Sequence, residues 1–204
     1  MIRQIKDGEL YFDGCSTLEL AERYGTPLYV LSETDIVSRF SELRECFTDK
    51  YPDTRVAYAA KAFSTMAMYR LCQREGACID VVSAGELYTA IKAGFPPEMI
   101  EFNGNNKLPY EIEMALDYGI GRFIVDGLGE TDLIEAICRE KGKKASILFR
   151  ITPGVKSDSH DYMVTGKKDS KFGIPLDEDV LYPQIEKAIA SEYIDFLGFH
   201  FHVG

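Results

Sequence analysis

The sequence predicts an α/β fold on a parallel sheet, in the form of a partial (β/α)8 TIM barrel with about six of its eight strands. Three observations lead to this prediction. From residue 55 onward, short apolar runs alternate with amphipathic stretches, the order expected of a parallel α/β sheet. The apolar runs show little strict alternation, which is typical of strands buried on both faces. Glycine repeatedly follows the amphipathic stretches, where a helix end favours a residue with positive φ.

Six strands and the helices between them can be placed in order. The predicted strands span residues 55–62, 77–83, 99–104, 122–127, 145–153 and 195–204. The predicted helices span residues 65–76, 84–94, 107–119, 129–142 and 177–192. The second helix shows the pattern clearly, because Leu87, Ala90 and Ile91 recur at i, i+3 and i+4 and Gly94 follows.

The strand count is lower than a closed barrel needs. A (β/α)8 barrel has eight strands and typically about 250 residues, whereas this chain has 204. The sequence stops inside an apolar strand with no helix after it. We therefore expect a fragment of a barrel. The alternative is a complete open sheet of six strands.

The first residues do not join the alternation. Residues 8–16, "GELYFDGCS", predict a short hairpin, and residues 17–33 predict a helix followed by a strand. A long helix is predicted over 32–52, beginning with a capping box from Ser32 to Asp35. We expect residues 1–31 to contribute to a β-rich domain and residues 32–204 to form the incomplete barrel.

Composition excludes several classes of protein. The formal net charge is -10, which argues against nucleic acid as a partner because phosphate binding needs a basic surface. No apolar run reaches the roughly 18 residues of a transmembrane helix, and the N-terminus lacks the apolar core of a signal peptide. The five cysteines are scattered without a CxxC motif, which predicts buried thiols in a reducing, cytoplasmic compartment.

Polar residues recur at the predicted carboxyl ends of the strands, where parallel barrels carry their chemistry. Lys61 is the most unusual, because alanines and Phe63 surround it. Small neighbours leave room for a flat ring, and apolar surroundings favour the neutral amine that forms a Schiff base. Asp80 could hold that amine in position. The plainer alternatives are a solvated rim lysine and a helix-capping aspartate. The full set is Lys61, Asp80, Ser83, Asn103, Asn105, Asp126, Arg150, His200 and His202.

His200 and His202 lie two apart on a predicted strand and so share one face. They could chelate a metal, stack on an aromatic cofactor, or pack as core residues. The metal hypothesis is the weakest, because His160 is the only other histidine. Residues 154–175, which contain His160, form a predicted loop of a length that is usually functional. We interpret it as an active-site loop.

Several motifs carry a resemblance to a known family. They are "YAAKA" with Lys61, "IDVVSAGEL" at 79–87, "FNGNNK" at 102–107, "FRITPG" at 149–154, "HDYMVTGKKDSKFGI" at 160–174 and "GFHFHVG" at 198–204. The chain, from about residue 10 to 204, resembles the fold-type III pyridoxal-phosphate-dependent decarboxylases. The motifs "DVVSAGEL" and "TGKKDSKFG" favour the diaminopimelate branch over the ornithine and arginine branches.

The resemblance implies an alanine-racemase-like barrel with a β-domain, working as a homodimer. It implies that Lys61 carries pyridoxal 5'-phosphate, that His202 stacks on the pyridine ring, and that Asp80 and Arg150 line the cofactor. No metal is expected, and His200 matches a variable position. The implied reaction releases CO2 from meso-2,6-diaminopimelate to give L-lysine.

Other functions stay open at this point. Further functional residues of the family are expected downstream of residue 204, so we expect the isolated chain to be inactive. The alternatives are a non-catalytic pyridoxal-phosphate carrier, an ornithine, arginine or carboxynorspermidine decarboxylase, and a metal-dependent barrel hydrolase.

Overall fold

A computed structural model describes residues 2–154 and 172–202. The chain divides into two compact units, Met1–Val56 and Ala57–Gly204, and each is described here by itself. The predicted domain boundary after residue 31 stays a prediction.

The first unit begins with three antiparallel strands. β1 spans Arg3–Lys6, β2 spans Glu9–Phe12 and β3 spans Cys15–Ser16, in the order β1-β2-β3. This confirms the hairpin predicted over 8–16 and adds β1 to it. Asp7 and Asp13 both have positive φ and each is followed by a glycine with positive φ, which is the Asp-Gly pattern of tight two-residue hairpin turns.

Two helices complete the first unit. α1 spans Thr17–Tyr24, and α2 spans Glu33–Leu43 and continues into one π-helical turn, Arg44–Thr48. The Ser32 hydroxyl accepts the Asp35 N–H at 3.0 Å, which confirms the predicted helix start. The strand predicted between the helices is wrong, because residues 26–32 have extended or irregular backbone without strand pairing. Pro27 lacks an N–H to donate, and Tyr29 is 95% exposed rather than packed.

The second unit is built on a parallel sheet. Its strands follow the order β10-β8-β7-β6-β5-β4, and every pair on this path is parallel. This confirms the predicted architecture and its six strands; the short β9 pairs with β8 in addition. The strands are β4 (Ala57–Ala59), β5 (Cys78–Val81), β6 (Ile100–Phe102), β7 (Arg122–Val125), β8 (Ala145–Thr152), β9 (Ile174–Pro175) and β10 (Ile194–His200).

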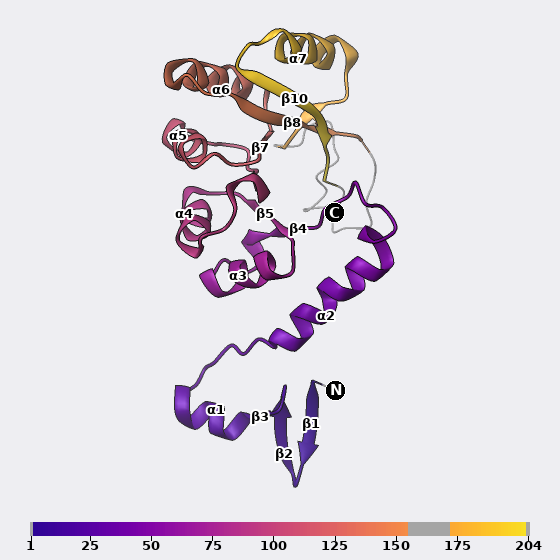
Figure 1. Cartoon of the computed structure of the whole chain (residues 1–204), viewed down its shortest axis with the longest axis vertical. Helices are drawn as coiled ribbons and strands as arrows, with labels where there is room; N and C mark the ends of the chain where they lie inside the picture. Colours follow the sequence, from indigo (N-terminus) through magenta and orange to yellow (C-terminus); the bar gives the residue numbers. More distant parts are fainter. Residues whose placement is uncertain (1, 155–171, 203–204) are drawn as a thin grey trace. The chain divides into compact units, whose positions relative to one another are not determined.

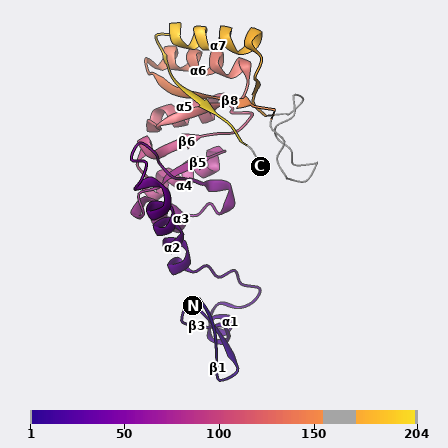
Figure 2. The ribbon, with the colours of Figure 1, turned by 90° about the vertical axis from the view of Figure 1, so that its right-hand side faces the viewer.

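Helices connect the strands of this unit. Figures 1 and 2 show α3 to α6 following one another along the sheet. The helices are α3 (Met66–Arg74), α4 (Ala84–Ala93), α5 (Pro109–Tyr118), α6 (Leu128–Lys141) and α7 (Glu178–Ala190), with short 3-10 turns η2 (Ala60–Ala62) and η3 (Pro97–Met99). All five predicted helices are confirmed within a few residues.

The core of the second unit lies between the strands and these helices. Phe102 and Phe123 on neighbouring strands stack with ring centroids 6.2 Å apart, and both are almost fully buried. Cys72, Cys78 and Cys138 are buried free thiols, whereas Cys15 and Cys46 are exposed, so most cysteines are buried as predicted. Within the described ranges, no helix is long and apolar enough to cross a membrane.

Candidate active site

The carboxyl ends of the parallel strands place the predicted site residues along one edge of the sheet. Asp80 lies in register with Ala59 of β4 and Glu101 of β6. At the other end of the strand order, His200 of β10 lies in register with Arg150 of β8. Asn103 and Asp126 follow directly after β6 and β7, and Lys61 lies two residues after the end of β4. The sheet therefore collects these side chains at the edge where the sequence predicted them.

Lys61 does not lie in a strand. The strand predicted over 55–62 is limited to β4, and Lys61 is exposed in the 3-10 turn η2, where the Phe63 N–H donates to the Ala60 carbonyl at 3.2 Å. The predicted extension of this strand through Lys61 is therefore wrong, because the chain turns before Lys61. Its ammonium group is close enough to oppose the rise that burial causes in the pKa of Asp80, and to add to the fall that burial causes in the pKa of His202.

Two tyrosines hold the turn that carries Lys61. The Tyr58 hydroxyl donates to the Phe63 carbonyl at 3.3 Å. The Tyr69 hydroxyl forms a 2.8 Å hydrogen bond with the Ser64 hydroxyl. Tyr69 is fully buried, and burial raises its pKa to about 12, so its hydroxyl stays protonated. The backbone just after Lys61 is therefore anchored to the core.

Removing the Tyr69 hydroxyl is expected to loosen this turn. Tyr69→Phe should lower the free energy of unfolding by about 1 kcal/mol, since it deletes one buried hydrogen bond, and amide exchange should accelerate at Phe63. Tyr118→Phe is the matched control, because the Tyr118 hydroxyl donates to the Phe95 carbonyl at 2.6 Å, away from the turn. Urea unfolding and site-resolved hydrogen exchange measure both effects. Equal exchange at Phe63 in the two variants would contradict the anchoring role.

Asp80 is a partly buried carboxylate with one unsatisfied oxygen. Its Oδ2 accepts a hydrogen bond from Asn103 Nδ2 at 3.4 Å. Its Oδ1 is buried and has no hydrogen-bond partner in the described part of the chain. Burial, reinforced by the charge of Glu101, raises the pKa of Asp80 to about 6, and the Lys61 ammonium opposes the rise. The site thus contains a carboxyl group that burial makes harder to ionise than an ordinary aspartate.

Replacing Asp80 with asparagine is expected to stabilise the cofactor-free chain at pH 7. The fold raises the pKa from 3.8 to about 6, so the folded state binds this proton more tightly than the unfolded chain. The contribution of Asp80 to stability therefore falls as pH rises from about 4 to about 6. At about 1.4 kcal/mol per pKa unit, Asp80→Asn should gain on the order of 2–3 kcal/mol at pH 7 and little near pH 4. Urea unfolding at both pH values tests this, and a gain of equal size at both would contradict it.

Arg150 is held in a buried ion pair. Its Nη1 donates to Asp126 Oδ1 at 2.8 Å, and the two side chains are only 10% and 3% exposed. The second oxygen of Asp126 accepts the Gly173 N–H at 3.1 Å. The guanidinium carbon of Arg150 lies 4.5 Å from the centroid of the Phe172 ring, a cation–π contact. Asp126 therefore pairs with a cation instead of capping a helix.

Lys107 is a second buried cation, and Glu130 connects it to this pair. The Lys107 ammonium donates to Glu130 Oε1 at 2.6 Å, and the other oxygen of Glu130 accepts the Asp126 N–H at 3.0 Å. Sequence reasoning missed both residues. The signal available was Glu130 at the third position of α6, where a glutamate often binds preceding backbone N–H groups.

The two histidines differ in their surroundings. His200 is half-buried, and its Nδ1 is buried without a hydrogen-bond partner in the described part of the chain. Burial, together with the charges of Arg150 and His202, lowers the pKa of His200 to about 4. His202 is exposed and lies beyond the end of β10; partial burial and then Arg150 and Lys61 lower its pKa. Both imidazoles are therefore predominantly neutral at pH 7.

Other predicted site residues have structural roles or lie outside the described ranges. Ser83 caps α4 by accepting the Glu86 N–H at 3.3 Å, and Asn105 is exposed. His160 and most of the predicted active-site loop fall within residues 155–171, outside the described residues. Within the described ranges, no group of three His, Cys, Asp or Glu side chains could hold a metal ion.

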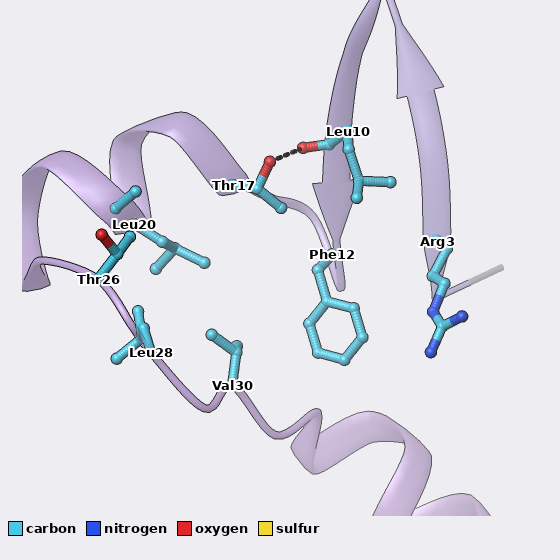
Figure 3. A pocket seen from close by; sticks show the side chains of 9 residues that line it. Arg3, Leu10, Phe12, Thr17, Leu20, Thr26, Leu28 and Val30 are labelled. Carbon is cyan, nitrogen blue, oxygen red and sulfur yellow. Dashed lines mark hydrogen bonds between the residues drawn. The ribbon is translucent and has the colours of Figure 1, made fainter.

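The first unit contains a cavity of its own, of about 290 Å³ (Figure 3). The hairpin, α1 and the segment after it supply its walls, and Arg3 is the one charged residue among those that line it. It shares no residue with the strand-end group. Its lining holds one charged residue and no pair of titratable side chains, so the strand-end group is the candidate site. The lining residues are Arg3, Leu10, Phe12, Thr17, Leu20, Ala21, Thr26, Leu28 and Val30.

Comparison with known proteins identifies the family of the chain. The family described as "Pyridoxal-dependent decarboxylase, pyridoxal binding domain" matches residues 33–204. A diaminopimelate decarboxylase of Bacillus methanolicus is 47% identical over 97% of this chain and 46% of its own length. The crystal structure of the M. jannaschii diaminopimelate decarboxylase with L-lysine superposes with a TM-score of 0.90 at 39% identity, covering 99% of this chain and 48% of that one.

A lysine/ornithine decarboxylase from Vibrio vulnificus, crystallised with putrescine, is more distant. It has a TM-score of 0.70 at 26% identity over 92% of this chain and 45% of its own. The chain spans about half the length of the curated relatives it matches. The parallel sheet is accordingly part of an alanine-racemase-like TIM barrel. With the family match covering most of the sequence, the chain belongs to the pyridoxal-dependent decarboxylases, and it aligns with the N-terminal half of the diaminopimelate decarboxylases it resembles.

Proposed function

We propose that this chain supplies the cofactor-binding part of an enzyme that decarboxylates meso-2,6-diaminopimelate to L-lysine, with pyridoxal 5'-phosphate as cofactor. The observation that carries the proposal is the common edge of Lys61, Asp80, Arg150 and His200, with His202 just beyond it. These residues come from four different strand ends. A primary amine, a carboxylate, a guanidinium and neutral imidazoles thus converge on one region.

The residues of this edge fit the cofactor. Asp80 Oδ1 and His200 Nδ1 are buried polar atoms that lack a partner in the described part of the chain, and such atoms are normally hydrogen-bonded. Lys61 is an exposed primary amine on a fixed turn. In the proposal Lys61 holds the cofactor covalently, His202 stacks on its ring, and Asp80 and Arg150 line it.

The residues at the strand edge would have separate roles in binding the cofactor. When bound, pyridoxal phosphate supplies an electron sink for the bond that breaks as CO2 leaves. Asp80, with a pKa of about 6, is mostly ionised at pH 7 and attracts the Lys61 amine in its protonated form. Arg150 is fixed by Asp126 and adds positive charge next to the histidines. Burial lowers the pKa of both imidazoles and this charge lowers it further, so that both are neutral at pH 7 and can pack against a flat ring.

The substrate is argued from similarity. Diaminopimelate decarboxylases reach 48% identity to this chain, whereas the lysine/ornithine enzyme reaches 26%. This difference favours diaminopimelate over ornithine as the amino-acid substrate. The proposal includes a homodimer in the cytoplasm, as the family resemblance implies.

The direct test uses the full-length product of the gene that encodes this chain, because the 204-residue chain alone is expected to be inactive. With pyridoxal phosphate it should release CO2 from meso-diaminopimelate and form lysine, and it should not release CO2 from L-ornithine at a comparable rate. Cofactor binding without CO2 release from either would overturn the proposal in favour of a non-catalytic carrier. Faster release from ornithine would reassign the substrate.

A further inference from the structure

A chain of four buried charged groups runs behind the proposed cofactor site. It begins at Lys107, whose side chain is only 1% exposed, and continues through Glu130, which is 10% exposed. Asp126 and Arg150 follow, at 3% and 10%. No step of the proposed function uses Lys107 or Glu130. Their burial therefore calls for an explanation.

Lys107 joins three separate elements. Its ammonium donates to the Gly104 carbonyl at 2.9 Å, the Ile124 carbonyl at 2.6 Å and Glu130 Oε1 at 2.6 Å. These acceptors come from the loop after β6, from β7 and from α6. All three donor positions of the ammonium are used, so this lysine has no remaining proton to offer a ligand.

Glu130 links Lys107 to Asp126 through hydrogen bonds. Its Oε2 accepts the Asp126 N–H at 3.0 Å, which fixes the backbone where β7 ends. The Asp126 carboxylate then binds Arg150 Nη1 at 2.8 Å and the Gly173 N–H at 3.1 Å. Arg150 is thus held at one end by a buried network whose other end is Lys107.

Stability alone does not account for a buried ion pair of this kind. Burying both charges carries a desolvation cost, and apolar residues of similar volume are often equally stable or more so. An apolar pair could not accept a hydrogen bond from the Asp126 N–H, and so could not fix the orientation of the Asp126 carboxylate. The charge of Lys107 also reaches the site, since it contributes to lowering the pKa of His200.

We propose that Lys107 and Glu130 are positioning residues, which hold Arg150 through Asp126 at the carboxyl edge of the sheet beside His200. The consequence for cofactor binding rests on the proposed function. The consequence for the surroundings of His200 does not.

The test replaces the pair without leaving an unpaired buried charge. Lys107→Met/Glu130→Met removes both charges and the bond to Asp126, whereas Lys107→Met/Glu130→Gln keeps a carbonyl oxygen for the Asp126 N–H. Lys143→Met is the matched control, because Lys143 also donates to a carbonyl, of Leu116, and to a carboxylate, of Asp117. Lys143 lies just before β8, at the amino end of the strand.

Two measurements are made on each variant after circular dichroism has established its fold. The dissociation constant for pyridoxal phosphate should rise about tenfold in the double methionine variant, comparable with the loss of a supporting partner behind a ligand. It should rise less in the glutamine variant and stay unchanged in Lys143→Met. The second measurement is the imidazole titration of His200 by NMR without cofactor. Among the described residues, the charged groups that act on His200 are Arg150, His202, Asp126 and Lys107. Losing Lys107 while releasing Arg150 should move the titration of His200 to higher pH.

The outcomes separate this inference from the proposed function. Wild-type cofactor affinity and a wild-type His200 titration in the folded double methionine variant would overturn it. If that variant does not fold, the glutamine variant decides in the same way against Lys143→Met. If the wild-type chain itself does not bind pyridoxal phosphate, the cofactor assignment fails, and the His200 titration still decides whether Lys107 and Glu130 position Arg150.

Discussion

Lys61→Ala is expected to abolish covalent binding of pyridoxal phosphate to this chain. The turn η2 presents the Lys61 amine at the strand edge next to Asp80, and the hydrogen bond between Tyr69 and Ser64 holds that turn in place. An alanine offers no nucleophile for the cofactor aldehyde. The visible absorbance of the imine should therefore disappear, and borohydride should fix no stoichiometric adduct.

Lys144→Ala is the matched control for this experiment. Lys144 is also exposed, but it lies immediately before β8, at the amino end of the strand. Its removal should leave the absorbance and the adduct unchanged. An equal loss in both variants would mean that labelling follows exposure, and Lys61 would then have no special role.

Asp126→Ala is expected to cause the largest loss of stability among single substitutions at this edge. The variant leaves the Arg150 guanidinium buried without its carboxylate, and it also removes the acceptor of the Gly173 N–H. Breaking a buried ion pair by removing one partner costs roughly 3–5 kcal/mol. Urea unfolding of the wild-type chain and the variant measures the difference.

Asp117→Ala serves as the control for an exposed ion pair. Asp117 binds Lys141 at 2.9 Å and Lys143 at 2.8 Å, but its side chain is 55% exposed. Exposed pairs contribute little, so the free energy of unfolding should change only slightly. If Asp126→Ala were as mild as this control, the buried network would not be a stabilising part of the fold. The inference about Lys107 and Glu130 would weaken with it.

Much of the fold could be predicted because the sequence carries local signals for it. The parallel strands are apolar runs and the helices between them have clear periodicity. The strand predicted after the first helix, within residues 17–33, failed because its apolar residues pair with no strand in the described part of the chain, and pairing is a tertiary property. The added strand β1 had a signal, since Asp7 and Gly8 form the turn that leads from it into β2.

The candidate site was predictable in outline and not in detail. Position at the carboxyl ends of strands was enough to bring Asp80, Asp126 and Arg150 together as candidates. The pairing of Asp126 with Arg150 depends on two side chains 24 residues apart, which no local pattern reveals. Lys107 could not be expected inside, because a buried lysine depends on acceptors from three different elements.

Identifying the lysine that pyridoxal phosphate modifies tests the central claim most directly. The wild-type chain is mixed with the cofactor, reduced with borohydride and digested, and the modified peptide is sequenced by mass spectrometry. A stoichiometric adduct on Lys61 is the result expected from the turn at η2 and its neighbours Asp80 and His202. Adducts spread over the exposed lysines, or a single adduct on another lysine, would contradict the assignment of the strand edge as the cofactor site.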